Sequence, residues 1–240
     1  MLIIDENVDC SRKNNLKYDE WLNVQLKLLH DKSKNFKKER NKNFTLKKIL
    51  IENKFKLCLE FGVFNGMTIN MISKYCDKVY GFDSFEGLPD DWNGVCKKEH
   101  FQVKGLPKVD KNTDLIKGWF NDTLDVFLNK NPSIIIDMIH IDCDLYSSTR
   151  DVFNILLKHN KIKKGLIIVF DELINYNKFY EGEIKALYEL NVNNNINFEW
   201  LYTHGNVINY EDILQEKYQN MTFKEFRNKG YQQEVAIKII

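Results

Sequence analysis

The feature that most constrains this chain is an alternation of short apolar runs with helix-length amphipathic stretches, which begins at Lys56. The strand-like runs cover 56–63, 78–84, 115–120, 133–142 and 165–172. The run at 133–142 is almost continuously apolar, which is typical of a strand buried on both faces of a parallel sheet. Because strands and helices alternate at this period, the sequence predicts βαβ units with right-handed crossovers. We therefore expect an α/β domain.

The two ends of the chain extend this pattern. Strands are expected at 198–205 and 233–240, separated by a helical stretch, and helices at Tyr18–His30 and Phe44–Ile51. A run of charged residues joins the two early helices and is interpreted as a solvated face or loop rather than a grip on phosphate. The predicted organisation is a helical extension over 1–54 and one domain over 55–240. Segment 85–113 is too long for an ordinary connection and is predicted to form a lid or substrate loop.

Composition narrows the class of protein. The chain has 240 residues, of which 43% are hydrophobic, enough for one sizeable core. Its 35 basic and 34 acidic residues disfavour a nucleic-acid partner, which usually requires a basic excess. Five cysteines without a C-x-x-C pair are expected to be free thiols in the reducing cytoplasm. No apolar run reaches the ~18 residues that would span a membrane, no signal peptide is recognised, and a homo-oligomer is left open.

A glycine-containing turn follows the first expected strand: Glu60-Phe-Gly62-Val-Phe-Asn-Gly66-Met-Thr68. Such glycines let the backbone pass close to a ligand. Asp83 ends the second strand, where it can accept hydrogen bonds from a ribose. The chain lacks G-x-G-x-x-G here, and Glu60 would repel a pyrophosphate. The cationic cofactor S-adenosylmethionine fits better than a dinucleotide, unless Glu60 merely closes a strand edge.

Carboxylates follow the fourth and fifth expected strands. Asp142 and Asp144 come after the fourth strand, and Asp171 and Glu172 after the fifth, which we expect to be parallel and adjacent to the fourth. Clustered carboxylates raise each other's pKa unless a cation lies between them. Mg²⁺ prefers oxygen ligands, so we expect it to bind Asp142, Asp171 and Glu172. For Asp144, hydrogen bonding to a helix N-terminus and water is an equal alternative.

A metal ion beside a methyl donor suits methylation of a hydroxyl. A cation stabilises the alkoxide of a sugar or phenol, and a nearby carboxylate takes the proton during attack on the sulfonium methyl. Asp142 or Asp144 is the candidate base. His140 is an alternative, although a histidine inside a buried strand is more often a core residue.

Five segments carry a resemblance to a known family. They are LEFGVFNGMT, GFDSFEGLPDDW, KGWFNDTL, HIDCDLYSST and IIVFDE, in this order within about residues 55–175. They resemble the macrocin O-methyltransferase family, whose class I, S-adenosylmethionine- and Mg²⁺-dependent members methylate sugar hydroxyls. The resemblance implies a single Rossmann-like domain, with a mostly parallel seven-stranded sheet and an antiparallel last strand. It also implies a small-molecule or glycan acceptor.

On matching positions, the resemblance implies three groups of site residues. Those around the methionine part of the cofactor are Glu60, Gly62, Gly66 and Thr68, with Asp142 also in contact. Those at the ribose and adenine are Asp83, Ser84, Gly118 and Trp119. The metal ligands are Asp142, Asp171 and Glu172, and Asp142 doubles as proton acceptor. Two positions depart from the family: Glu172 is often aspartate, and Leu145 stands where some relatives carry a basic catalytic residue.

Other functions remain open at this point. A nucleic-acid methyltransferase would share the fold, but the chain lacks the N/D-P-P-Y/F tetrad. A non-catalytic binding protein would keep the fold without affinity for the cofactor, and a phenolic acceptor is a further alternative. The aromatic residues that could stack on an acceptor, or simply anchor loops, are Trp92, Phe101, Phe179 and Tyr180.

Overall fold

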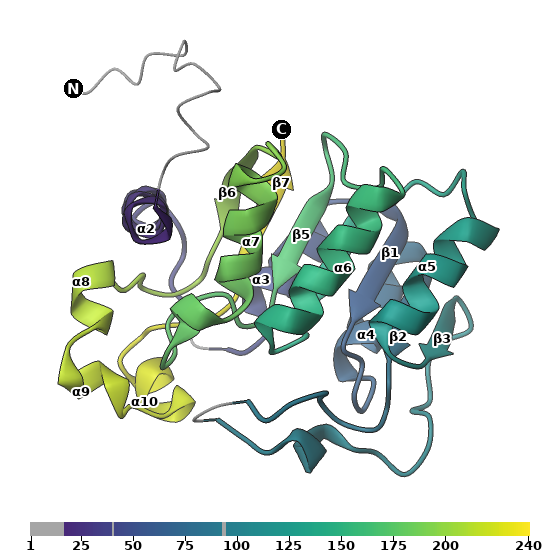
Figure 1. Cartoon of the computed structure of the whole chain (residues 1–240), viewed down its shortest axis with the longest axis horizontal. Coiled ribbons are helices and arrows are strands. Elements are labelled where there is room, and N and C mark those ends of the chain that lie inside the picture. The colour runs from purple at the N-terminus through teal and green to yellow at the C-terminus, as the bar shows by residue number, and fades with distance from the viewer. Residues whose placement is uncertain (1–16, 40, 93–94) are drawn as a thin grey trace.

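A seven-stranded sheet lies between two layers of helices in the computed structural model, which describes residues 17–39, 41–92 and 95–240 (Figure 1). The strand order is β3-β2-β1-β4-β5-β7-β6. Strands β1 to β5 pair in parallel, and β7 runs antiparallel to both β5 and β6. This arrangement confirms the predicted α/β class and the antiparallel last strand.

The strands are short. They are β1 (Phe55–Phe61), β2 (Cys76–Asp83), β3 (Thr113–Lys117), β4 (Met138–Ile141), β5 (Ile167–Phe170), β6 (Phe198–Tyr202) and β7 (Val235–Ile239). The prediction of a strand over 133–142 is wrong for its first half, which is not a strand and where Ile135 is 78% exposed. The Asp137 carboxylate there accepts the backbone N–H groups of Lys56 and Leu57, so pairing of β4 with β1 starts only at Met138.

The helices cover the sheet on both faces. They are α2 (Tyr18–Ser33), α3 (Phe44–Glu52), α4 (Met67–Ile72), α5 (Phe120–Lys130), α6 (Tyr146–Lys158), α7 (Glu183–Val192), α8 (Tyr210–Ile213), α9 (Glu216–Gln219) and α10 (Phe223–Asn228). Single 3₁₀ turns lie at Ser73–Tyr75, Lys98–Phe101 and Phe179–Glu181. Helices α5, α6 and α7 lie on one face of the sheet, and α3 and α4 on the other (Figure 1). Each face has its own cluster of buried apolar side chains.

The two expected N-terminal helices are confirmed as α2 and α3. Helix α2 buries Trp21, Leu22 and Leu26 and contacts α7 and β6, whereas α3 contacts β7. Both helices are therefore packed onto the sheet domain. Residues 1–16 of the predicted extension lie outside the described residues, and the boundary between 54 and 55 stays a prediction.

The sequence predicts that Asp122 or Thr123 caps α5 and that Ser147, Ser148 or Thr149 caps α6, and both predictions are wrong. Helix α5 begins at Phe120, so Asp122 and Thr123 lie inside its first turn, and Thr123 Oγ1 donates to Trp119 O at 2.8 Å. Helix α6 begins at Tyr146, ahead of the serines and the threonine expected to cap it. Neither helix has a side-chain cap, and the buried Ser148 and Thr149 pack in the first turn of α6.

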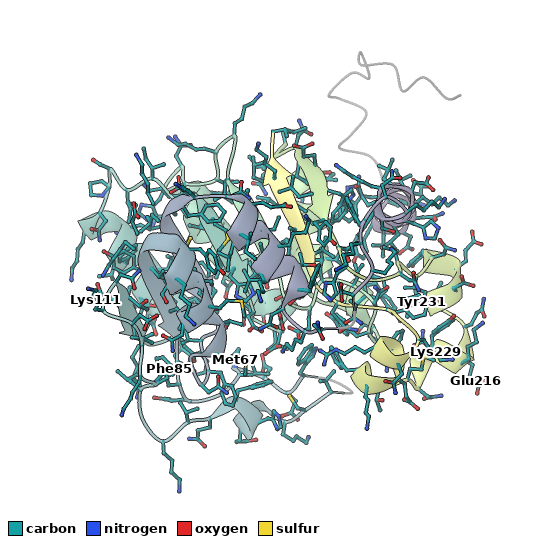
Figure 2. The ribbon with its side chains drawn as sticks, turned by 180° about the vertical axis from the view of Figure 1, so that it is seen from behind. Met67, Phe85, Lys111, Glu216, Lys229 and Tyr231 are labelled. Atoms are coloured by element: carbon teal, nitrogen blue, oxygen red, sulfur yellow. The ribbon has the colours of Figure 1, made fainter. Side chains whose placement is uncertain are left out.

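The segment between β2 and β3 crosses below the lower ends of the strands (Figure 1). Isolated bridges join Glu86 to Gln102 and Trp92 to Cys96, and Trp92 is only 9% exposed. Seen from behind, Met67 and Phe85 lie toward this lower edge (Figure 2). The described part of the segment is thus anchored to the domain, and its role as a lid stays a prediction.

Two further expectations concern the state of the cysteines and the absence of a membrane-spanning segment. Cys58, Cys76, Cys96 and Cys143 are free thiols, whereas Cys10 lies outside the described residues. Over the part of the chain that the structure describes, no helix has the length and apolar character needed to cross a bilayer.

Candidate active site

A cavity of about 270 Å³, here called the first cavity, opens at the carboxyl ends of β1 to β5. Ligands of open α/β sheets bind at this end of the strands. Most predicted site residues line it: Gly62, Thr68, Asp83, Ser84, Trp119, Asp142, Asp144 and Glu172. The structure therefore brings together residues that the sequence spreads over more than a hundred positions.

Four predicted site residues do not line the first cavity. Gly66 and Gly118 shape its surroundings with positive φ angles of 82° and 141°, at the start of α4 and after β3. Glu60 is fully buried within the sheet. Asp171 is 1% exposed and lines a separate small hollow. Lys42 lines both this hollow and the first cavity.

Asp83 ties two loops of the first cavity together. Its Oδ2 accepts the backbone N–H groups of Val63 at 2.7 Å and Phe64 at 2.8 Å, and its Oδ1 accepts that of Phe85 at 2.6 Å. A carboxylate offers about four acceptor positions. Asp83 thus holds the turn after β1 against the loop after β2 and retains one position for a ligand hydroxyl.

Gly62 allows the ends of β1 and β4 to approach closely. Its φ is +91°, and a Cβ placed on it would lie 1.8 Å from the carbonyl oxygen of Asp142. The Asp142 N–H donates to the Phe61 carbonyl at 2.9 Å, which extends the pairing to this point. Gly62 therefore determines where Asp142 enters the first cavity. The sequence predicted only that Gly62 contacts the cofactor.

Asp142, Asp171 and Glu172 form a compact cluster. Each offers an oxygen, and these atoms lie within 4.8 Å of one another. Burial, and then the charge of Asp171, raises the pKa of Asp142 to about 7, and the same two causes raise that of Glu172 well above its ordinary value. Asp171 Oδ1 and Glu172 Oε2 accept no hydrogen bond from the described residues. Oxygen ligands that are buried and lack partners fit a hard divalent cation.

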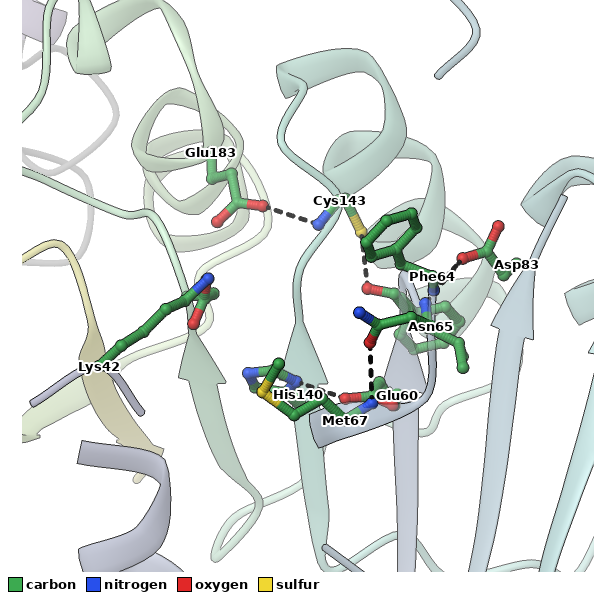
Figure 3. A network of polar contacts seen from close by, with 12 residues as sticks. Lys42, Glu60, Phe64, Asn65, Met67, Asp83, His140, Cys143 and Glu183 are labelled. Carbon is green, nitrogen blue, oxygen red and sulfur yellow. Dashed lines mark hydrogen bonds and ion pairs between the residues drawn. The ribbon is translucent and has the colours of Figure 1, made fainter. Parts of the chain in front are cut away.

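Lys42 is the functional candidate that sequence reasoning missed. Its Nζ lies 3.2 Å from Asp171 Oδ2, and Figure 3 shows Lys42 and Asp83 on opposite sides of the site. Burial alone would raise the pKa of Asp171, but the Lys42 ammonium holds it below its ordinary value. Lys42 is half exposed, in keeping with the interpretation of the charged run as solvated, but it also pairs with Asp171, a contact that was not predicted. The run contains so many similar lysines that nothing in the sequence singles this one out.

Asp144 and His140 are the two base candidates outside the cluster of three carboxylates. Asp144 lines the first cavity with a positive φ of 63°, and burial followed by the charge of Asp142 raises its pKa well above the ordinary value. His140 does not line it: its Nδ1 lies 2.9 Å from Glu60 Oε1, and both side chains are fully buried (Figure 3). Burial would lower the pKa of His140, but Glu60 raises it to about 9. The geometry favours the core interpretation of His140.

Comparisons with known proteins agree with this fold. Residues 59–173 match a family described as "Methyltransferase domain". CalS11, a calicheamicin methyltransferase, is 21% identical over 82% of this chain and 94% of its own, with a TM-score of 0.54. The O-methyltransferase NovP is 16% identical over 92% of this chain and 99% of its own, with a TM-score of 0.52. Among curated proteins, no sequence matches this chain.

The sheet order, the cavity at the carboxyl ends of the strands and the family match point to one class of enzyme. At these low identities the two solved structures support the fold only, whereas the family match concerns the sequence itself. Residues 59–173 thus match a methyltransferase domain, and the sheet around them has the strand order of the class I methyltransferase fold.

Proposed function

We propose that the protein is a Mg²⁺-dependent O-methyltransferase that transfers the methyl group of S-adenosylmethionine to a hydroxyl of a small-molecule sugar or glycoside. The observation that carries this proposal is the cluster of Asp142, Asp171 and Glu172, whose oxygens lie within 4.8 Å of one another beside the first cavity. The resemblance of HIDCDLYSST and IIVFDE to the macrocin O-methyltransferase family supports the same ligands. The name of NovP describes that protein as an O-methyltransferase.

The first cavity suits the cofactor in several ways. The unused acceptor position of Asp83 would bind a ribose hydroxyl, with Ser84 beside it. Trp119 is 38% exposed on the cavity wall, where its ring can stack on adenine. Gly62 and Thr68 would contact the methionine part. Glu60 would act on the cofactor only through its charge, because it lies beneath the wall.

The proposed reaction moves one proton and one methyl group. A bound Mg²⁺ would supply positive charge that stabilises the acceptor oxygen as its proton leaves. Asp142 or Asp144 takes that proton, and an oxygen lone pair then attacks the methyl carbon. The carbon–sulfur bond breaks with its electrons remaining on sulfur, which leaves S-adenosylhomocysteine. Asp144 lies outside the cluster of three ligands, so all of its lone pairs stay available for the proton.

The test separates cofactor binding from metal-dependent turnover. We expect the wild-type protein to bind S-adenosylhomocysteine in calorimetry, and to methylate members of a glycoside panel only when Mg²⁺ is restored after chelation. Asp171→Asn should keep that affinity and lose turnover, while the exposed Asp114→Asn should behave as wild type. Full turnover after exhaustive chelation would remove the metal from the mechanism. Tight binding of RNA or DNA on filters would favour a nucleic-acid substrate instead.

A further inference from the structure

A second cavity of about 100 Å³ adjoins the first one. It lies between the long loop after β2, the start of α6 and the segment after β5. Its lining includes Asp91, Trp92, Asp144, Tyr176, Lys178 and Glu181. Trp92 and Asp144 also line the first cavity. Only these two side chains are shared, so a ligand in the second cavity would lie beside a base candidate of the first.

A buried hydroxyl lies at the wall of the second cavity without a partner. Tyr176 is 2% exposed, and its hydroxyl has no hydrogen-bond partner among the described residues. A Cβ placed on Gly182, another lining residue, would lie 2.2 Å from this oxygen. The buried Asn177 Oδ1 is likewise unpaired within the described chain. Because buried polar atoms are nearly always paired, these two atoms indicate a polar ligand.

Aromatic rings pack against one another at the second cavity. The ring of Trp92 meets that of Tyr176 edge-on at 5.8 Å and that of Phe223 at 5.4 Å. Tyr176 stacks on Phe223 with 12° between the ring planes. An aromatic face beside carboxylate, amide and hydroxyl oxygens suits a ring compound that has both C–H faces and hydroxyls.

The charges around the second cavity disfavour an anionic ligand. Asp91 is paired with Lys97 at 2.6 Å, which leaves the carboxylates of Asp144 and Glu181. Among the described lining residues, Lys178 is the one cation, and it is exposed to solvent. A phosphate placed here would meet the Glu181 carboxylate, the acidic side chain of Asp144 and one screened ammonium. A neutral group would meet no such repulsion, and a cationic group would be attracted.

We propose that the second cavity is an acceptor subsite that binds a neutral or amino-substituted sugar ring and excludes a phosphorylated one. This proposal rests on the proposed function, which supplies the methyl-transfer reaction. It adds where the acceptor binds and which charge the acceptor can carry. Tyr176 and Asn177 hydrogen-bond the ring, Trp92 packs on its face, and the hydroxyl to be methylated points past Asp144 into the first cavity.

Saturation-transfer NMR with defined probes tests this subsite. The protein, with Mg²⁺ and S-adenosylhomocysteine, is titrated with methyl α-glucoside, glucosamine and glucose 6-phosphate. We expect the first two to bind and glucose 6-phosphate to bind at least about tenfold more weakly, the factor that 1.4 kcal/mol represents. Gly182→Ala, which crowds the Tyr176 hydroxyl, and Tyr176→Phe should each weaken sugar binding about tenfold.

Matched controls come from elsewhere in the chain. Gly165→Ala meets no atom within 4 Å, and Tyr202→Phe removes a hydroxyl that donates to Lys37 O on the other side of the sheet. Both should leave sugar binding unchanged. Equal binding of glucose 6-phosphate, no binding of either unphosphorylated probe, or unchanged sugar affinity in both cavity variants overturns the proposal. Failure of S-adenosylhomocysteine to bind would contradict the proposed function alone. The sugar titration would then be carried out without S-adenosylhomocysteine and would still test the subsite.

Discussion

The Lys42 ammonium nitrogen lies 3.2 Å from Asp171 Oδ2, although Lys42 belongs to the segment between α2 and α3 and Asp171 follows β5. The contact links the N-terminal segment to the candidate metal ligands. Since Lys42 also lines the first cavity, the segment before the sheet domain contributes to the site that the domain carries.

Removing the Lys42 charge should destabilise the metal-free protein. Lys42→Gln removes the ammonium group that pairs with Asp171, and because Lys42 is half exposed we expect a loss of about 1 kcal/mol in the free energy of unfolding. The same variant should bind Mg²⁺ more tightly, since a competing cation is gone. Urea unfolding in chelator and Mg²⁺ titration measure the two effects. Lys37→Gln, at a surface pair, is the control, and equal behaviour of both variants would refute a role for Lys42.

Two glycines with nearly the same φ angle distinguish the cost of a strained backbone from the cost of a steric contact. Gly62 has φ +91° and Gly165 has φ +96°, but only a Cβ at Gly62 meets another atom, Asp142 O at 1.8 Å. Gly165→Ala should therefore cost about 1–2 kcal/mol of stability for the left-handed backbone. Gly62→Ala should cost distinctly more and weaken S-adenosylhomocysteine binding, because the end of β4 must move. Urea unfolding and calorimetry of both variants decide this, and equal losses would mean that the contact is unimportant.

Asp83→Asn should weaken cofactor binding. The carboxylate accepts three backbone N–H groups, and an amide would place its NH₂ group against at least one of them. Hydrogen bonds to charged groups contribute about 1.5–3 kcal/mol, so we expect a ~10–100-fold loss of affinity for S-adenosylhomocysteine. Calorimetry measures it, with Asp114→Asn on the neighbouring strand as the control. An affinity within threefold of wild type would exclude Asp83 as a ribose ligand.

The buried pair of His204 and Glu234 predicts a pH dependence of stability. The two side chains lie 3.4 Å apart, yet burial lowers the pKa of His204 to about 4, and burial together with Asp171 raises that of Glu234 to about 8. Both groups are therefore neutral near pH 7. For Glu234, whose ordinary value is 4.5, the unfolded chain loses its proton first. The contribution of Glu234 to stability should consequently fall as the pH rises from about 4.5 to about 8, by about 1.4 kcal/mol per unit. The contribution of His204, whose ordinary pKa is 6.5, rises with pH up to about 6.5, so the net loss from the pair should appear between about pH 6.5 and pH 8.

Glu234→Gln should remove this loss. A glutamine oxygen can still accept the Thr45 N–H, which the carboxylate accepts at 2.8 Å. The stability of the variant relative to wild type should therefore increase from pH 5 to pH 8 and then level off. Urea unfolding across this range without divalent metal measures it. The exposed Glu216→Gln should show no trend, and a flat difference for Glu234→Gln would contradict the pKa assigned to this group.

The sequence by itself determined the class of fold and much of the site. The alternation of apolar runs predicted the sheet because hydrophobic periodicity is a local property of the chain. It also predicted that Asp142, Asp171 and Glu172 would meet, because neighbouring parallel strands end at the same edge. Helix starts were less accessible, since α5 and α6 begin at aromatic residues without side-chain caps.

Only the tertiary structure decided the rest. The register of β1 on β4 places Glu60 opposite His140. Glu60 consequently lies inside the sheet and not on the cavity wall, where the sequence predicted it. The packing of distant segments brings Lys42 to Asp171 and the Tyr176 hydroxyl over Gly182. The sequence does not single out Lys42 or Tyr176, because similar side chains lie close to each of them along the chain. A lysine among lysines or a tyrosine among aromatics acquires its role from the segment packed against it, and that partner is chosen by the fold.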